Sequence, residues 1–221
     1  MSVSALAERK SRLIRKALDA AVFCAHDDAT PITAITTGAE AELITLDPDY
    51  VSLGHHSEEE GVNWTREVEN ADTRSHGSQE PTRRDITSDV SGLTVVAQET
   101  KMKTLEMFHN VDLSAVEADP TTGEIAFNRA VTPATRYYRV LTVAQDGAGD
   151  DAIYFARFLP RASVTEFSEQ EWTKETELRY ELSLTAYVDE DLGYAMREMW
   201  GGPGLAAVLS DMGFSVASSS S

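Results

Sequence analysis

The residues best suited to chemistry are His55, His56 and the three glutamates that follow Ser57. Imidazole nitrogens and carboxylate oxygens are common ligands of transition metals, so this cluster has the residue types of a metal site. Neighbouring side chains of an extended chain point in opposite directions, however, and the two histidines could not easily chelate one ion. We therefore predict no metal centre here.

A second acidic group, Asp146, Asp150 and Asp151, surrounds a glycine-containing turn. A calcium loop needs oxygen ligands at alternate positions and a closing glutamate, and this turn has neither. The sequence has no G-x-S-x-G, P-loop or H-E-x-x-H motif, and its glycines at 201–204 form no dinucleotide-binding fingerprint. We predict a protein that is not an enzyme and needs no cofactor, with a hydrolase built from scattered carboxylates as an alternative.

The charge balance excludes several classes of partner. The 221 residues carry 19 basic and 37 acidic side chains, a net charge of −18, which repels nucleic acids and anionic membranes. No apolar run approaches the roughly 18 residues of a membrane span, and no signal peptide is expected. The single cysteine, Cys24, excludes an intrachain disulfide, fits a reducing cytoplasm and is expected to be a small buried apolar residue.

Apolar patterns predict a chain made mainly of strands. Strand patterns cover residues 41–47, 61–69, 91–99, 123–131, 136–146, 152–160 and 177–189. Helical spacing predicts helices at 4–22, 100–110, 190–200 and 205–214. Because hairpin-like turns connect strands and helices do not follow every strand, we expect a mainly β (α+β) fold, an antiparallel β-sandwich or half-barrel with flanking short helices.

Residues 177–189, ELRYELSLTAYVD, show the clearest two-faced pattern. Six apolar side chains alternate along one face, and burying them is worth about 9–18 kcal/mol as an upper bound, so this face must cover a core. The other face is polar and must meet water or partners. Its candidate functional residues are Glu177, Arg179, Glu181, Ser183 and Thr185.

The sequence divides into a basic N-terminal helix or arm (1–30), a β-sandwich domain (31–193) and a C-terminal helix with a serine-rich tail (194–221). Five basic residues lie on the predicted first helix, so we expect it to dock onto the acidic body or another copy, with DNA binding as the competing reading. Residues 70–90 are almost free of apolar side chains and predict a long polar loop.

An ordered series of segments resembles the major tail protein of long-tailed, siphovirus-type bacteriophages, especially those of actinobacteria. Leu53 and Gly54 form the family's turn, an acidic run enters a strand at Gly61, and Arg83 begins a threonine-containing strand. The later segments are KTLEMFHNVDLS (103–114), YRVLTVAQDG (138–147), YFARFLPRASVTE (154–166) and YELSLTAYVDEDLG (180–193). The resemblance covers residues 30–193.

The resemblance implies a virion protein, made in the host cytoplasm, whose copies form hexameric rings. The rings stack into a tail tube with a closed β-barrel around the channel that delivers the genome. The tube would hold tape measure protein and double-stranded DNA without specific binding, and would contact other tail proteins at its ends. The polar residues at 177–185 listed above become candidates for the lumen, where negative charge would repel DNA.

Contacts between copies or rings are expected at the basic N-terminal segment and the 70–90 loop. The candidate residues are Arg12, Arg15, Lys16, Arg74, His76, Arg83 and Arg84. A head–tail connector or tail-terminator ring, which has a related fold, is one alternative. A soluble acidic β-sandwich that binds another partner is the other.

Overall fold

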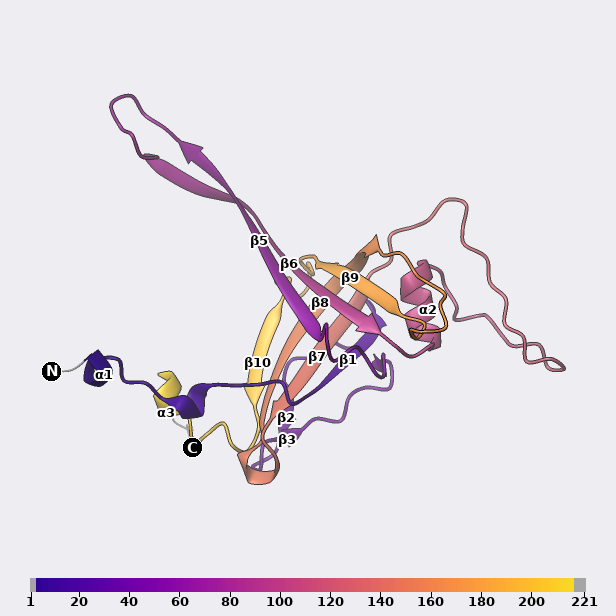
Figure 1. The fold of residues 1–221 in the computed structure, drawn as a ribbon, viewed down its shortest axis with the longest axis horizontal. Coiled ribbons are helices and arrows are strands. Elements are labelled where there is room, and N and C mark those ends of the chain that lie inside the picture. The colour runs from indigo at the N-terminus through magenta and orange to yellow at the C-terminus, as the bar shows by residue number, and fades with distance from the viewer. Residues whose placement is uncertain (1–2, 217–221) are drawn as a thin grey trace.

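Period-two apolar patterns produce most of the strands, which form one strongly curved antiparallel sheet with short helices around it (Figure 1). The computed structural model describes residues 3–216. The strands are β1 (Asp19–His26), β2 (Thr36–Thr37), β3 (Glu42–Leu43), β4 (Val51–Ser52), β5 (Val62–Thr73), β6 (Arg83–Ala97), β7 (Tyr138–Asp146), β8 (Ile153–Phe167), β9 (Tyr180–Ala186) and β10 (Arg197–Gly201). The helical segments are α1 (Val3–Leu6), η1 (Ser11–Leu13), α2 (Met102–His109), η2 (Gly149–Asp151) and α3 (Leu209–Met212).

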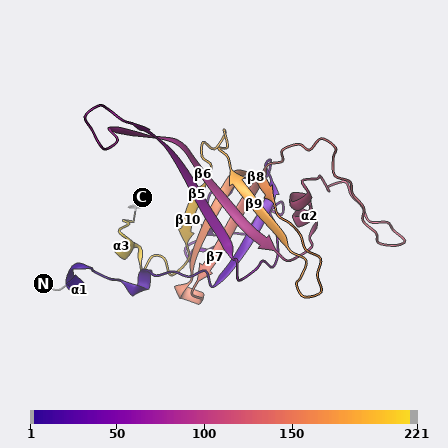
Figure 2. The same ribbon diagram turned by 45° about the horizontal axis from the view of Figure 1, so that its top comes forward.

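Strand β8 joins the two halves of the sheet. The main order is β4-β1-β7-β8-β9-β6-β5, and β10 also pairs with β8. β7 follows one edge of β8 as far as Ala162, while β10 and then β9 follow the other edge. Since β8 bends as it passes from one set of partners to the next, the sheet curls into the half-barrel seen in Figure 2.

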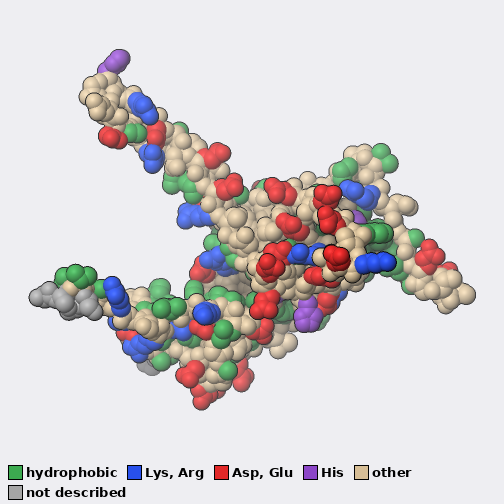
Figure 3. All heavy atoms as spheres, viewed as in Figure 1, with side chains coloured by type: hydrophobic (Ala, Val, Ile, Leu, Met, Phe, Trp, Pro, Cys, Tyr) green, Lys and Arg blue, Asp and Glu red, His purple; other side chains and the backbone are tan. Residues whose placement is uncertain are grey.

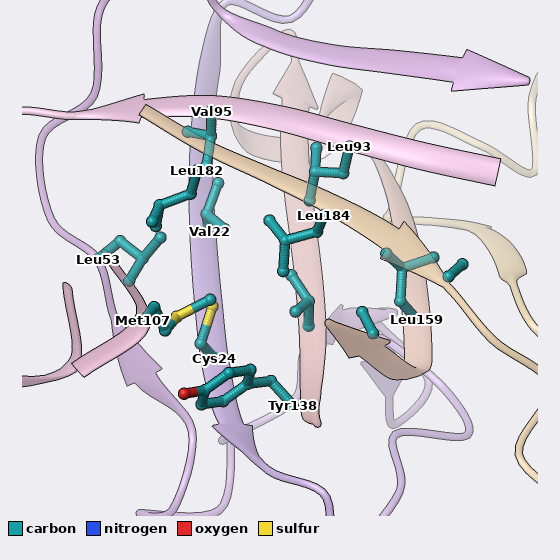
Figure 4. Packing of buried hydrophobic residues seen from close by; sticks show 13 residues of the cluster. Val22, Cys24, Leu53, Leu93, Val95, Met107, Tyr138, Leu159, Leu182 and Leu184 are labelled. Atoms are coloured by element: carbon teal, nitrogen blue, oxygen red, sulfur yellow. The ribbon is translucent and has the colours of Figure 1, made fainter. Parts of the chain in front are cut away.

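The inside of the curl holds the larger core (Figure 4). Leu182 and Leu184 of β9 meet Val22 and Cys24 of β1 across it, while Met107 of α2 closes one side. The buried members are Val22, Cys24, Leu53, Leu93, Val95, Met107, Tyr138, Val140, Leu159, Ala162, Leu182, Leu184 and Ala186. The apolar face predicted for residues 177–189 is thus confirmed between Tyr180 and Ala186.

A second core lies on the opposite face of β1, β7 and β8, where the connection between β1 and β4 covers it. Its buried members are Ala25, Ala29, Ile32, Ile35, Tyr50, Leu141, Ala156, Phe158 and Met199. Burial on both faces explains why residues 152–160 are apolar without strict alternation.

Helix α2 agrees with its sequence signals. Asn110 ends the helix in the left-handed conformation, with φ of 53°. The helix buries an ion pair as well as apolar atoms: Lys103 Nζ lies 3.2 Å from Glu106 Oε2, and both side chains are almost fully buried. Lys103 also contacts His26 Nε2 at 2.9 Å, so the pair fastens α2 to β1.

The predicted N-terminal helix at 4–22 is wrong. Helical structure is limited to α1 and the single turn η1, and residues 19–26 instead form β1, which pairs with β7 along its whole length. Val22 and Cys24 enter the core at a period of two, and burial in the sheet outweighs the helical spacing upstream. Leu6, Ile14 and Leu18 are left largely exposed.

Five other predictions about elements are also corrected. The polar loop at 70–90 is a hairpin in which β5 and β6 remain paired as far as Thr73 and Arg83. The strand predicted at 123–131 is irregular, and the helix predicted at 190–200 is a turn followed by the start of strand β10. The 177–189 strand spans only β9, because its ends have no ladder partners. The C-terminal helix shortens to α3, and residues 217–221 of the predicted tail lie outside the described residues.

Candidate assembly surfaces

The outer face of β5, β6, β9 and the end of β8 is lined by hydroxyl and amide side chains, and we call it the polar face. Cross-strand register places its residues side by side: Asn63, Thr65, Thr94, Thr165, Ser183 and Thr185. Thr94 and Ser183 hydroxyls lie 3.1 Å apart, and those of Thr165 and Thr185 lie 2.9 Å apart. Alternation along β9 produces this face, because every second side chain enters the core.

Carboxylates lie within the polar face as well as at one end of it, since Glu166 of β8 is directly opposite Ser183 of β9. Glu181 lies on β9, whereas Glu177 and Arg179 precede the strand and belong to an exposed network with Glu60. Gln98 donates a hydrogen bond of 2.8 Å to Glu177, and hydrogen bonding holds the pKa of that carboxyl below its usual range. The five predicted lumen residues therefore separate into three on the polar face and two in the network at its end.

The four strands of the polar face have two free edges within the described part of the chain. β5 pairs only with β6, so its other edge is open along Val62–Thr73. β7 leaves β8 at Ala162, so residues 164–167 of β8 pair only with β9. Open edges present unpaired backbone N–H and C=O groups and are templates for pairing with another chain.

The distal parts of β5 and β6 form a projecting hairpin arm, residues 66–90 (Figures 1 and 2). Its charges are mostly paired within the arm: Arg66 bonds Asp89 at 2.8 Å, and Arg84 bonds Asp72 at 2.7 Å. Each arginine holds the pKa of its partner carboxyl below the usual range. The arm is therefore an ordered element of defined shape, unlike the loop expected from its polar composition.

The predicted contact residues of the arm divide between its tip and its ladder. Arg74 and His76 are exposed in the tip that connects β5 to β6. Arg83 bonds Asp85 at 2.9 Å, and Arg84 bonds Asp72 across the ladder. Arg74 and His76 thus remain available at the surface, whereas the other two charges serve the arm itself.

The chain ends lie together and form a terminal lobe, which we define as residues 3–18 and 203–216 (Figure 1). Lys10 Nζ lies 2.8 Å from Asp211 of α3, and Arg12 pairs with the same carboxylate. Arg15 reaches Asp146 at the end of β7, at 3.3 Å. Of the three predicted N-terminal contact residues, Arg12 and Arg15 are thus engaged within the chain and only Lys16 has no ion pair among the described residues.

Alternation in the sequence identified Ser183 and Thr185, but the other four residues of the polar face, Thr165 among them, were missed. Asn63 and Thr65 belong to a strand that was predicted, and Thr94 to another. Their side chains join the face only because β6 lies between β5 and β9, an order that no local signal reveals. The period-two pattern in 61–69 and 91–99 was the available signal.

Two other kinds of site were searched for within residues 3–216. No group of three or more His, Cys, Asp or Glu side chains is arranged to hold a metal ion there. None of the helices in that range is long and apolar enough to cross a membrane.

An extended polar face with open sheet edges on both sides is the geometry of a subunit that joins copies of itself. The sequence matches the family model described as phage tail tube protein over residues 7–197. The chain belongs to the phage tail tube protein family. No curated protein matches it.

Membership of the phage tail tube family gives the chain a structural role in the virion tail, and its copies assemble into a tube together with other tail proteins. The family match covers every strand of the curved sheet up to the start of β10. The resemblance seen in the sequence is therefore confirmed at the level of the tail tube family.

Proposed function

We propose that this phage tail tube protein forms hexameric rings in which the β5 edge of one copy pairs with residues 164–167 of β8 in the next. The observation that carries the proposal is the pair of open edges bordering the polar face. Edge-to-edge pairing would satisfy the exposed backbone groups of both strands and would remove every edge from the ring. The rings would stack into the conduit of a siphovirus-type, actinobacteriophage-like tail.

The dimensions of such a ring suit a genome channel. Each copy contributes four strands, β5, β6, β9 and the end of β8, to the shared barrel. Six copies at about 4.8 Å per strand make a circumference of about 115 Å, or a backbone-to-backbone diameter of about 37 Å. Strand tilt widens the barrel further, so side chains on both walls leave room for duplex DNA.

In this arrangement the polar face lines the lumen, with Ser183 and Thr185 at its centre and Glu181 toward one end. Hydroxyls carry no charge that would hold a phosphate backbone, and carboxylates repel it. DNA and tape measure protein would then pass without specific binding. The lining would combine these hydroxyls with the carboxylates of Glu166 and Glu181, whereas the sequence led us to expect an acidic lumen.

The hairpin arm reaches beyond the body and, in this proposal, contacts a neighbouring ring through its exposed tip. Arg74 and His76 are its candidate contact residues. Ring closure and ring stacking would thus use different parts of β5 and β6, the open edge near the body and the distal arm.

Cryo-electron microscopy of the purified chain tests the proposal. We expect stacked rings whose inner wall is a continuous barrel with a β5–β8 junction between copies. Rings that never stack would favour a connector or terminator ring. A monomer at all concentrations, with its β5 edge amides still exchanging freely with solvent, would favour a soluble binding module and contradict the proposal.

A further inference from the structure

A groove of about 570 Å³ opens on the concave side of the sheet, away from the polar face. We call it the aromatic groove. Phe155 and Trp200 stack at 5.2 Å between ring centroids on neighbouring strands, and the Arg157 guanidinium lies 5.1 Å from the Trp64 ring. Trp200 is still 39% exposed, so part of this aromatic surface is left uncovered by the described chain. Apolar surface of this kind in a soluble subunit marks a contact site.

The rim of the aromatic groove is acidic. Asp19, Glu58 and Glu198 line it, with Arg157 as the only Lys or Arg among its described lining residues. Arg157 is already paired with Glu198 at 3.1 Å. The groove therefore favours an occupant that is apolar and positively charged.

The terminal lobe has both properties. Several of its large apolar side chains are solvent-exposed, with Leu6 66%, Ile14 71% and Phe214 62% exposed. Over residues 3–18 and 203–216 it carries five basic side chains against Glu8 and Asp211, a net charge of +3. Figure 3 shows its apolar and basic side chains projecting away from the acid-rich body.

The other exposed apolar segments in the described chain carry the opposite charge. The hairpin arm, with Val68 and Ile86 exposed, has four arginines against six carboxylates, a net charge of −2. The connections at 111–137 and 168–179 each have two basic and four acidic side chains, also −2. Charge complementarity thus selects the terminal lobe over these three segments.

We propose that the terminal lobe of one copy occupies the aromatic groove of another copy, as a contact separate from the β5–β8 junction. The inference builds on the proposed self-assembly and names one of its interfaces. The lobe does not occupy its own groove, because Ala17 and Leu18 line the groove's margin and the preceding residues run away from it. Leu6 and Ile14 would supply apolar contacts to Phe155 and Trp200, while Arg9 and Lys16 would face Asp19 and Glu58.

Cross-linking between two variants that each carry one introduced cysteine tests this contact. Ser11→Cys lies in the lobe and His55→Cys lies in the groove, and both positions are exposed. Burial raises the pKa of the native Cys24 thiol to about 12, so it will not compete for a maleimide reagent. Mixed tubes treated with a short bismaleimide should yield the S11C–H55C heterodimer, which only a contact between copies can produce.

Two matched variants replace the lobe cysteine in the same mixture. Val131→Cys is a fully exposed position outside the lobe, and Ile86→Cys lies on the hairpin arm. We expect both to cross-link to H55C far less than S11C does. Equal yields from S11C and V131C, or a higher yield from I86C, would overturn the assignment of the lobe to the groove.

A second measurement does not depend on cysteine geometry. Leu6→Glu with Ile14→Glu changes only exposed side chains and should leave the fold intact, while raising the concentration needed for assembly about tenfold or more. An unchanged assembly threshold would overturn the inference. If the wild-type chain forms neither rings nor tubes, the proposed function fails; if it forms tubes and both lobe tests are negative, only this inference fails.

Discussion

Removing the hairpin arm should separate folding of the subunit from its assembly. The variant deletes residues 70–87 and joins Glu69 to Ser88 through Asn-Gly, a two-residue turn that suits paired antiparallel strands. Glu69 and Ser88 already face each other in the ladder, so the remaining register is undisturbed. The polar face and the open edge next to the body are retained.

The effect on stability is expected to be small. Neither hydrophobic core contains a residue from 70–87, and Ile86, the large apolar residue removed, is 65% exposed. Replacing these eighteen residues by two reduces the loop-closure cost by about 2 kcal/mol, which offsets the loss of the arm's own ladder. The melting temperature should therefore stay within a few degrees of wild type.

Assembly, by contrast, should fail at the step that uses the arm. Thermal melting measures folding, and electron microscopy with size-exclusion chromatography measures assembly. We expect a folded chain that forms isolated rings without stacked tubes. Val131→Ala, a change at a fully exposed position outside the arm, is the control and should melt and assemble like wild type. Normal tubes from the deletion variant would refute a role of the arm in stacking, and loss of folding would refute its independence from the core.

Four further predictions concern separate features of the chain. Leu182→Ala removes a fully buried side chain from the larger core and should reduce the free energy of unfolding by about 2–5 kcal/mol. Urea denaturation measures this loss, and a smaller one would contradict the packing in Figure 4. Lys103→Met leaves the buried Glu106 without its cation and should reduce the free energy of unfolding by about 3–5 kcal/mol in the same assay. Adding Glu106→Met should restore most of this loss. If the effects of the two substitutions simply add, the two side chains are not coupled. Hydrogen bonding from Lys10, followed by the charge of Arg12, lowers the pKa of Asp211, so the stability that this carboxylate adds to the terminal lobe is present above its unfolded-state pKa and is lost as pH falls through the folded value. Amide exchange in residues 10–13 should therefore rise on acidification in the wild type and be fast at all pH values in Asp211→Asn. Exchange in the wild type that does not change with pH would exclude this role of Asp211. Ser183→Lys with Thr185→Lys should leave the tubes intact, but the added lysines should hold duplex DNA inside them. This DNA should be protected from nuclease and should be released by salt. DNA that the nuclease still digests would place the polar face outside the lumen.

Local patterns in the sequence predicted the parts of the fold that local forces determine. The strands at 61–69, 91–99 and 136–146 were recognisable because alternation reports directly on a half-buried sheet. The helix predicted at 100–110 was recognisable from its apolar spacing, and it forms as α2. The buried face of β9 followed from the same alternation.

The errors arose where distant contacts decide the structure. The spacing of apolar residues at 4–22 is helical and does not reveal that the segment containing Val22 and Cys24 pairs with β7 as a strand. The hairpin arm has almost no apolar residues, and what orders it is cross-strand pairing such as Arg84 with Asp72, twelve positions apart. Neither pairing has a local signature.

The candidate surfaces divide in the same way. Glu181, Ser183 and Thr185 were placed on one face because they alternate within a real strand, while Glu177 and Arg179 were misplaced because β9 begins only at Tyr180. The open edges of β5 and β8 depend on strand order, which follows from the whole topology. The terminal lobe was beyond prediction because its two halves lie about two hundred residues apart, joined through Asp211.

The internal pairing of the hairpin arm has a consequence for how fast and how reproducibly a tail can grow. A disordered segment of this length would have to give up about 1–2 kcal/mol of backbone entropy for each residue that it fixes on contact. In the arm, this backbone entropy is lost when the chain itself folds, because the strand ladder and the arginine–aspartate pairs already fix the arm's conformation. In the proposed stacking contact, an arriving subunit would therefore present a preformed arm, and its binding would be limited by orientation rather than by a search among conformations.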